Sequence, residues 1–253
     1  TLGFVDREMR SANGGFFSAL DADSERPVTA VHGEAGQRAE GAYYLWHESE
    51  LKKLLSREEF PFIKEYFSIE KHGNIFSDPH EEFSQLNILY INETFRDKKL
   101  LPEQEQLLAS ASEKLNKQRR LRPGPLLDDK VITAWNGMMI SSFARAAQVF
   151  DEPSLLQKAR DSVRFIKNKL YDEKNEKLYR QYRQQQVSID ATLSDYAWLI
   201  HALLEIHEAE RFCHAGKGNT STGENSQWLN WAMVLQGAQE TLFLDKASGA
   251  YFE

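Results

Sequence analysis

Residues 193–210 read LSDYAWLIHALLEIHEAE, and their pattern decides the fold class. Their apolar side chains recur every three or four residues, which is the spacing that places side chains on one face of an α-helix. The stripe consists of Leu193, Tyr196, Ala197, Ile200, Leu203, Leu204 and Ile206. A helix with so wide an apolar face must bury that face against other helices.

The same periodicity recurs along the chain and predicts further helices. They span Glu48 to Leu55, Arg57 to Tyr66, Pro102 to Leu121, Val131 to Phe150, Pro153 to Leu170 and Gln227 to Leu244. Strand signals are few and short, and two polar, Gly-containing stretches, Glu25 to Gly41 and Phe212 to Asn225, are predicted surface loops. We therefore predict an all-α chain whose helices are joined by short β turns.

Three similar turns indicate a repeating unit. Each follows a helix, begins with polar or Gly residues and ends in bulky side chains: Ser11 to Phe17, Asp172 to Tyr179, and Asp245 to Phe252. Aligning the helix that starts near Ile132 with the one that starts at Leu193 brings their apolar positions into register. The unit is a helical hairpin, which cannot bury both faces alone, so hairpins must stack into a solenoid or close into a ring.

Composition narrows the classes of function. The chain of 253 residues has 41% hydrophobic residues, enough for a buried core, and a net charge of -7 that is spread along the sequence. This balance argues against binding to nucleic acid or to an anionic membrane. Even the richest apolar segment, Val131 to Phe150, contains Asn136 and Arg145, so no span of about 20 apolar residues predicts a transmembrane helix.

Cysteine and histidine usage predicts neither a disulfide nor a metal site. The single cysteine, Cys213, has no partner for a disulfide or a C-x-x-C motif, which favours a reducing cytoplasmic location. His201 and His207 lie six positions apart, on different faces of a helix, so we expect them to be solvated rather than metal ligands. No phosphate-binding Gly loop is present, and no cofactor is predicted.

The first cluster that fits a chemical role contains Asp21 and Asp23. Two carboxylates at a spacing of two point the same way on an extended backbone, which suits an acid and base pair or a hydroxyl-binding site. Trp46 follows beyond the first loop. The alternative is that both aspartates bond to their own backbone as turn formers.

The second cluster surrounds the start of the most apolar helix. Asp128, Asp129 and Lys130 precede it, and Trp135 and Asn136 lie in its second turn. Capping explains one aspartate without any function, because acids are favoured at helix starts. An indole and an amide so near the start also fit a helix that faces a ligand.

A third cluster, Asp195 and Tyr196, occupies the aligned position in the next hairpin, matched to Ala134 and Trp135. In a ring of hairpins, equivalent helix starts converge on one mouth. We therefore expect Asp195 and Tyr196 to share a site with Asp129 and Trp135, although capping is again an alternative for Asp195.

Four segments together resemble a known family. They are GGFFSALDADS at 14–24, EGAYYLW at 40–46, DDKVITAWNGMMI at 128–140 and DYA at 195–197. They resemble the spermatogenesis-associated protein 20 family over nearly the whole chain, and the tryptophan-centred segment is the most specific. The stretch Glu25 to Ala39 departs from the family as an insertion where relatives have a short acidic turn.

The resemblance implies a domain organisation. Members of this family pair an N-terminal thioredoxin-like domain with a C-terminal toroid of six helical hairpins, similar to glycosidases and to N-acylglucosamine 2-epimerases. Residues 1–253 are then part of one (α/α)6 toroid, with the thioredoxin-like domain and the terminal hairpins outside this chain. The thioredoxin-like domain is expected as a covalently linked partner.

Two functions remain open. The first is a sugar-directed enzyme, an epimerase, an isomerase or a glycoside hydrolase, in which Asp21, Asp23, Asp128 and Asp129 supply acid and base. Its sugar ligand would stack on Trp46 and Trp135 and form hydrogen bonds with Asn136 and Lys130. Epimerase relatives rely on a histidine pair, for which this sequence offers no convincing match. The second is a non-catalytic module that binds a ligand or a client protein for the thioredoxin-like domain.

Overall fold

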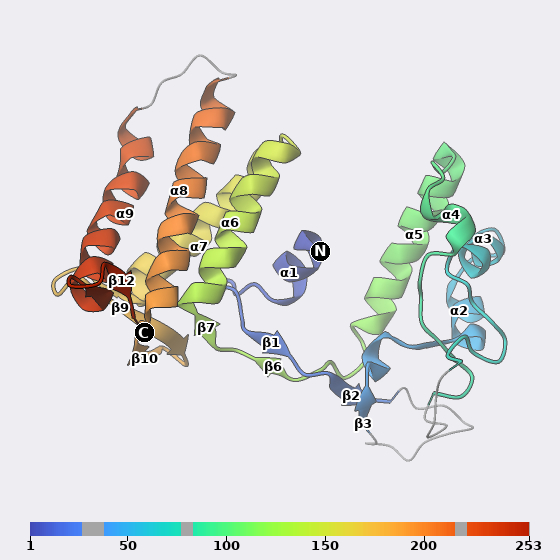
Figure 1. Cartoon of the computed structure of the whole chain (residues 1–253). Helices are drawn as coiled ribbons and strands as arrows, with labels where there is room; N and C mark the ends of the chain where they lie inside the picture. The colour runs from blue at the N-terminus through green and yellow to red at the C-terminus, as the bar shows by residue number, and fades with distance from the viewer. Residues whose placement is uncertain (27–37, 77–82, 216–221, 253) are drawn as a thin grey trace. The chain divides into compact units, whose positions relative to one another are not determined.

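The computed structural model describes residues 1–26, 38–76, 83–215 and 222–252, without the side chains of 213–226. Contacts divide the chain into two compact units. Unit 1 contains Thr1–Ala19 and Leu127–Glu253, and unit 2 contains Leu20–Leu126. Helices dominate both units, which confirms the predicted class (Figure 1). That all residues form one toroid stays a prediction.

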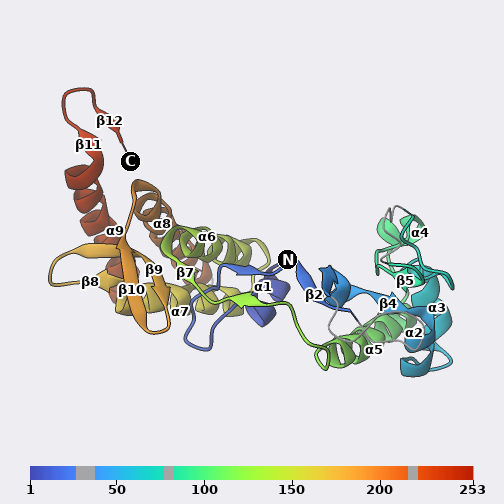
Figure 2. The same ribbon diagram turned by 90° about the horizontal axis from the view of Figure 1, so that it is seen from below.

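Two helical hairpins build most of unit 1. Helix α6 (Thr133–Val149) pairs with α7 (Pro153–Lys169), and α8 (Leu193–Ala215) pairs with α9 (Thr222–Phe243). Helices α6 and α8 lie side by side in both views (Figures 1 and 2). The predicted stacking of hairpins is therefore present in this unit.

The core of unit 1 lies among these four helices. Phe143 of α6 is fully buried and stacks on Phe16 with ring centroids 5.3 Å apart. Gly137 lets α6 approach α8, because a Cβ atom at this position would lie 2.6 Å from the carbonyl oxygen of Trp198. The other buried members include Ile140, Leu156, Val163, Ile166, Leu199, Leu203, Ile206, Trp228 and Leu235.

The three predicted turns have a common form. Helix α1 (Leu2–Glu8) is followed by a bridge between Arg10 and Phe16, and α7 and α9 are followed by antiparallel strand pairs. These pairs are β8 (Tyr171–Asp172) with the start of β9 (Lys177–Arg183), and β11 (Leu244–Asp245) with β12 (Ala250–Tyr251). The carboxylates of Asp172 and Asp245 accept hydrogen bonds from N–H groups within their turns. The helix-then-turn repeat is therefore confirmed.

A small sheet connects the starts of α6 and α8, and it is longer than the sequence indicates. Strand β7 (Val131–Ile132) pairs with β9 (Lys177–Arg183), which pairs with β10 (Gln186–Asp190), all antiparallel. Strand β7 runs directly into α6, and β10 leads into α8. Two inner helices that begin far apart in sequence are thereby anchored to one sheet.

The ends of several helices differ from the predicted ends. Helix α3 begins at Glu59 instead of Arg57, and α8 and α9 extend into the predicted loop Phe212–Asn225, of which 216–221 lie outside the described residues. Periodicity detects only the turns that bury an apolar face, so polar final turns escape it. Among the described residues, no helix is long and apolar enough to cross a membrane.

Unit 2 is a smaller helical body with its own core. Its helices are α2 (Glu48–Leu54), α3 (Glu59–Tyr66), α4 (Glu93–Arg96) and α5 (Pro102–Arg119), with a 3-10 turn, η1 (Ala42–Tyr44). Trp46, Leu51, Ile63, Ala111 and Leu115 are buried between them. Short strands complete it: β2 (Asp23–Glu25) pairs with β3 (Arg38–Glu40), and β4 (Trp46–His47) with β5 (Leu86–Asn87).

One predicted loop lies in unit 2, and two short strands mark the passages of the chain between the units. The predicted loop Glu25–Gly41 starts and ends as the paired strands β2 and β3, and its residues 27–37 lie outside the described residues. The strands β1 (Ala19–Leu20) and β6 (Leu127–Asp128) mark the two places where the chain passes between the units.

Candidate ligand-binding face

Asp195 joins the start of α8 to the start of α6. Its carboxylate is fully buried, and its Oδ1 accepts a hydrogen bond of 2.9 Å from the backbone N–H of Ala134. Its Oδ2 accepts from the backbone N–H of Thr192 at 3.0 Å and from Nη1 of Arg180 at 3.1 Å. The first turn of a helix has free N–H groups, so Asp195 supplies a cap to a neighbouring helix as well as to its own. It therefore positions both helix starts.

Asn136 and Tyr196 also face the interior. The amide of Asn136 accepts from the N–H of Phe16 at 2.7 Å and donates to its carbonyl at 2.9 Å. The hydroxyl of Tyr196 accepts from the N–H of Leu178 at 3.3 Å, and burial raises the pKa of this tyrosine. Both residues are 1% exposed and bond to backbone groups in the interior. Their contact with a ligand stays a prediction.

Four charged side chains around the loop before α6 are partly exposed to solvent. Oδ1 of Asp129 pairs with Nε of Arg183 at 2.6 Å, and Oδ2 of Asp128 pairs with Nζ of Lys130 at 3.0 Å. Partial burial raises the pKa of Asp128, but hydrogen bonds from Lys130 and Ser18 outweigh this and keep the pKa below its usual range. The Asp128 carboxylate is therefore ionised and available as a hydrogen-bond acceptor.

Exposed stripes run along α6 from its first turn and along α8 from its second turn. Their members recur at intervals of three and four residues, so each stripe lies on one face of its helix. On α6 they are Trp135, Met138, Ser142, Arg145 and Val149, and on α8 they are Trp198, His201, Glu205, Glu208 and Phe212, of which Glu205 alone is mostly buried. Trp135 is 49% exposed and Trp198 38%, although indoles are usually well covered.

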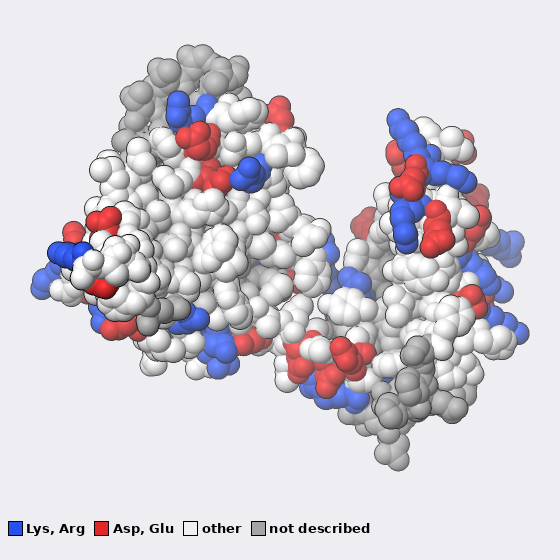
Figure 3. Space-filling view, viewed as in Figure 1, with Lys and Arg blue, Asp and Glu red and all other residues white. Residues whose placement is uncertain are grey.

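Contacts link the two stripes. Nη1 of Arg145 on α6 lies 3.2 Å from Oε1 of Glu205 on α8, and His201 Nε2 is 3.9 Å from the same oxygen. The rings of His201 and Trp198 meet edge to face at 5.8 Å. These side chains and Trp135 form the α6–α8 face, which presents two indoles beside groups that donate and accept hydrogen bonds. In the view of Figure 3, uncharged side chains cover most of unit 1 and charged ones gather in small groups.

Trp198, Arg145 and Glu205 do not stand out in the sequence as candidate ligand-binding residues. The repeat matches Trp135 with Tyr196, but burial places Tyr196 in the core, and Trp198, two residues further along α8, is the exposed indole of that helix. His201 is exposed, as expected from its neighbours. Matching the exposed positions of the two helices, instead of their first turns, is the signal that identifies Trp198.

The other predicted residues belong to unit 2. Asp21 accepts hydrogen bonds from the N–H of Asp23 at 3.1 Å and from Arg38 at 3.1 Å, as a turn-forming aspartate does. Trp46 is 1% exposed, and the guanidinium of Arg122 lies 4.0 Å from its ring centroid. A shared site for Asp21, Asp23 and the aspartates before α6 stays a prediction.

A cavity of about 770 Å³ opens elsewhere in unit 1, between α9 and the strands before α8. Its walls are mostly apolar, with Met233, Val234 and Phe243 among them, and an ion pair of 2.7 Å between Lys177 and Asp190 lies at its polar part. It shares only Tyr196 with the predicted site. Within the described residues, no group of three or more His, Cys, Asp or Glu side chains is placed to hold a metal ion.

These features define a helical-hairpin protein whose inner helices present an aromatic and charged face. No family model matches the chain. Human spermatogenesis-associated protein 20 is 31% identical over 99% of this chain and 33% of its own length. We therefore identify the chain as a homologue of spermatogenesis-associated protein 20 that spans about a third of that protein's length.

Two solved structures are similar to part of this chain. Cellobiose 2-epimerase from Bacillus thermoamylovorans is 19% identical and superposes with a TM-score of 0.40, over 48% of this chain and 29% of that one. The GH76 α-mannanase of Bacteroides thetaiotaomicron is 13% identical, with a TM-score of 0.41, over 59% of this chain and 42% of that one.

Proposed function

We propose that this domain binds a carbohydrate on the α6–α8 face. The observation that carries the proposal is the pair of half-exposed indoles, Trp135 and Trp198, on the exposed stripes of two adjacent helices. An indole offers a flat apolar surface and a polar edge, which suits a sugar ring with an apolar face and a hydroxyl rim. Solvent exposure of two such rings has no packing benefit within unit 1.

Charged groups beside the indoles suit the hydroxyls of a sugar. Glu205 accepts and Arg145 donates, and the ion pairs before α6 add both kinds of group. Hydrogen bonds to ionised groups are stronger than those between neutral partners. Salt-bridged side chains are also held in place before the ligand arrives, which lowers the entropy lost on binding.

The state of Asp128 favours binding over bond cleavage. A glycosidase acid must hold its proton near neutral pH, and this requires a raised pKa. The pKa of Asp128 is lowered by Lys130 and Ser18. In our proposal Asp128 therefore accepts a hydrogen bond from a sugar hydroxyl and does not donate a proton.

The alternative is a non-catalytic module that holds a ligand or a client for a covalently linked thioredoxin-like domain. That link, and the cytoplasmic location, stay predictions. The two functions differ in what binds to the α6–α8 face, so one set of titrations separates them.

The test is a calorimetric titration of the full-length protein with glucose, mannose, cellobiose and mannobiose. We expect saturable binding to at least one sugar and at least a tenfold loss of affinity, about 1.4 kcal/mol, in Trp135→Ala and in Trp198→Ala. Phe150→Ala is the matched control, because this exposed ring lies at the other end of α6, roughly 20 Å along the helix. Equal affinity in all variants, or no binding at all, refutes the proposal and favours the client module.

A further inference from the structure

A second, polar cavity lies in unit 1 between the loop that follows α1 and the last turns of α7. Its volume is about 410 Å³, within the range of small-molecule sites. Four residues of the loop form one wall, and five residues of α7 form the other: Arg10, Ala12, Asn13 and Gly14 on the first, and Asp161, Arg164, Phe165, Asn168 and Lys169 on the second. None of its lining residues belongs to the α6–α8 face, so this cavity is separate from the face of the proposed function.

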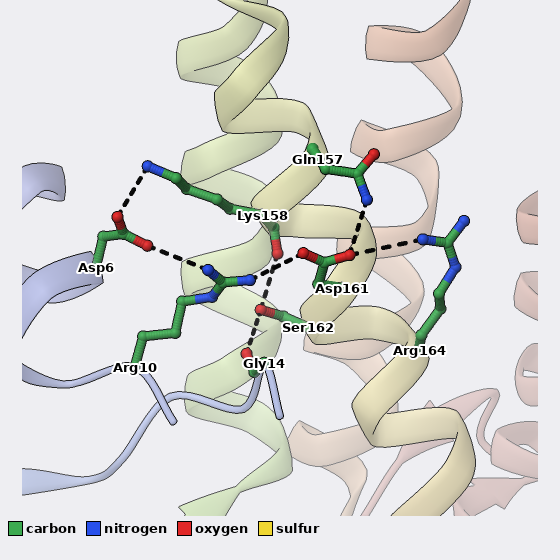
Figure 4. A network of polar contacts seen from close by, with 8 residues as sticks. All are labelled: Asp6, Arg10, Gly14, Gln157, Lys158, Asp161, Ser162 and Arg164. Atoms are coloured by element: carbon green, nitrogen blue, oxygen red, sulfur yellow. Dashed lines mark hydrogen bonds and ion pairs between the residues drawn. The ribbon is translucent and has the colours of Figure 1, made fainter. Parts of the chain in front are cut away.

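The loop wall is held firmly against α7. Gly14 has a φ of +106°, and a Cβ atom there would lie 2.8 Å from the carbonyl oxygen of Asp161. The hydroxyl of Ser162 donates a hydrogen bond of 2.6 Å to the carbonyl of Gly14, as Figure 4 shows. A cavity between two parts that are bonded together in this way is formed before any ligand binds.

Arg10 brings a buried donor to the cavity. Its Nη1 lies 3.4 Å from Asp6 and its Nη2 3.0 Å from Asp161, so two acids fix the guanidinium (Figure 4). Its Nε is buried and has no hydrogen-bond partner. Buried donors in folded proteins almost always have an acceptor, so an unpaired one at a cavity wall indicates an absent anion or water.

Positive charge predominates in the lining. Arg10, Arg164 and Lys169 face a single carboxylate, that of Asp161. Asp161 is already bonded to Arg10 and Gln157, and Arg164 lies 3.6 Å away from it with its side chain 47% exposed. No ion pair holds Lys169 in the described part of the chain. A basic residue in the last turn of a helix offsets the helix dipole, but that role leaves the concave shape and the buried Nε of Arg10 unexplained.

We propose that this cavity binds a small molecule through a phosphomonoester group. Arg164 and Lys169 would pair with the phosphate oxygens, since a guanidinium fork and an ammonium both match phosphate geometry. The guanidinium of Arg10 adds a third positive charge to the lining. Asn13 and Asn168 also line the cavity and supply amides for a polar body beyond the phosphate. The volume exceeds that of inorganic phosphate alone, which favours a phosphorylated metabolite of about the size of a sugar phosphate.

Calorimetry on the full-length protein tests this site with inorganic phosphate, glucose 6-phosphate and glucose. We expect inorganic phosphate to bind, glucose 6-phosphate to bind at least fivefold more tightly, and both affinities to fall at least tenfold in Arg164→Gln and Lys169→Gln. Arg211→Gln is the control, because it removes an exposed arginine from α8. Circular dichroism confirms that each variant is folded.

Three outcomes overturn the proposal. They are the absence of phosphate binding, affinities in Arg164→Gln and Lys169→Gln that equal the wild type, and an equal loss in Arg211→Gln, which indicates unspecific charge attraction. Phosphate titrations of Trp135→Ala keep the two sites apart. Phosphate affinity is expected to be unchanged in that variant, even if the carbohydrate proposal fails.

Discussion

Replacing Asp195 with alanine is expected to loosen the starts of α6 and α8 together. The variant leaves the N–H of Ala134 and the N–H of Thr192 without acceptors, and Arg180 without its counter-ion. Each buried N–H that loses its partner costs about 1 to 3 kcal/mol. Arg180 is one-third exposed, so water recovers part of its loss. The expected total is about 3 to 5 kcal/mol, the range for breaking a buried charge pair.

Urea unfolding of the full-length protein, followed by circular dichroism, measures this loss, and hydrogen exchange at Ala134 locates it. Asp129→Asn is the control close to the start of α6. The side chains of Asp129 and Arg183 are both exposed, so we expect the loss of their ion pair to cost about 0 to 1 kcal/mol. A loss below 1 kcal/mol for Asp195→Ala refutes the assignment of Asp195 as the connecting cap. An equal loss for Asp129→Asn also refutes this assignment, because a buried and an exposed aspartate would then contribute equally to stability.

Three further predictions concern packing and charge. The pKa of Glu59 is raised by burial but lowered more strongly by hydrogen bonds from Lys114 and from residues 56 and 110, to about 2 from 4.5. The ion pair of Glu59 with Lys114 should therefore contribute about 3 kcal/mol to the free energy of unfolding above pH 4.5, and this contribution is lost as the pH falls towards 2. Acid unfolding of Glu59→Gln should lack this phase. Gly137→Ala should lower stability by about 1 to 3 kcal/mol in urea unfolding, because its Cβ meets the carbonyl of Trp198. In a carboxyl NMR titration, Asp128 should titrate below the usual range of aspartate, and a midpoint at or above that range contradicts our geometry.

The structure separates two kinds of polar residue at the helix starts that look alike in sequence. Asp195 and Asn136 are buried and bond to backbone groups, whereas Asp128 and Asp129 are paired at the surface. Capping and ligand binding use the same residue types at the same positions. Only burial and partners distinguish them.

Local pattern was sufficient for the helices and the repeated turns. A helix in a hairpin protein buries one face, so its apolar residues recur every three or four positions and can be counted without a structure. The turns after α1, α7 and α9 share polar starts and bulky ends because each must reverse the chain within a few residues. The helical class and the hairpin repeat therefore follow from the order of residues along the chain.

The tertiary structure alone decided which side chains meet. Tyr196 and Trp198 lie in the same turn of one helix, yet the close packing of α6 on α8 at Gly137 buries the first and exposes the second. Arg10 and Asp161 are separated by 151 residues and converge on one cavity because the loop after α1 packs on α7. Periodicity is a property of neighbours along the chain, whereas a binding site is made by neighbours in space, and the packing of helices sets those.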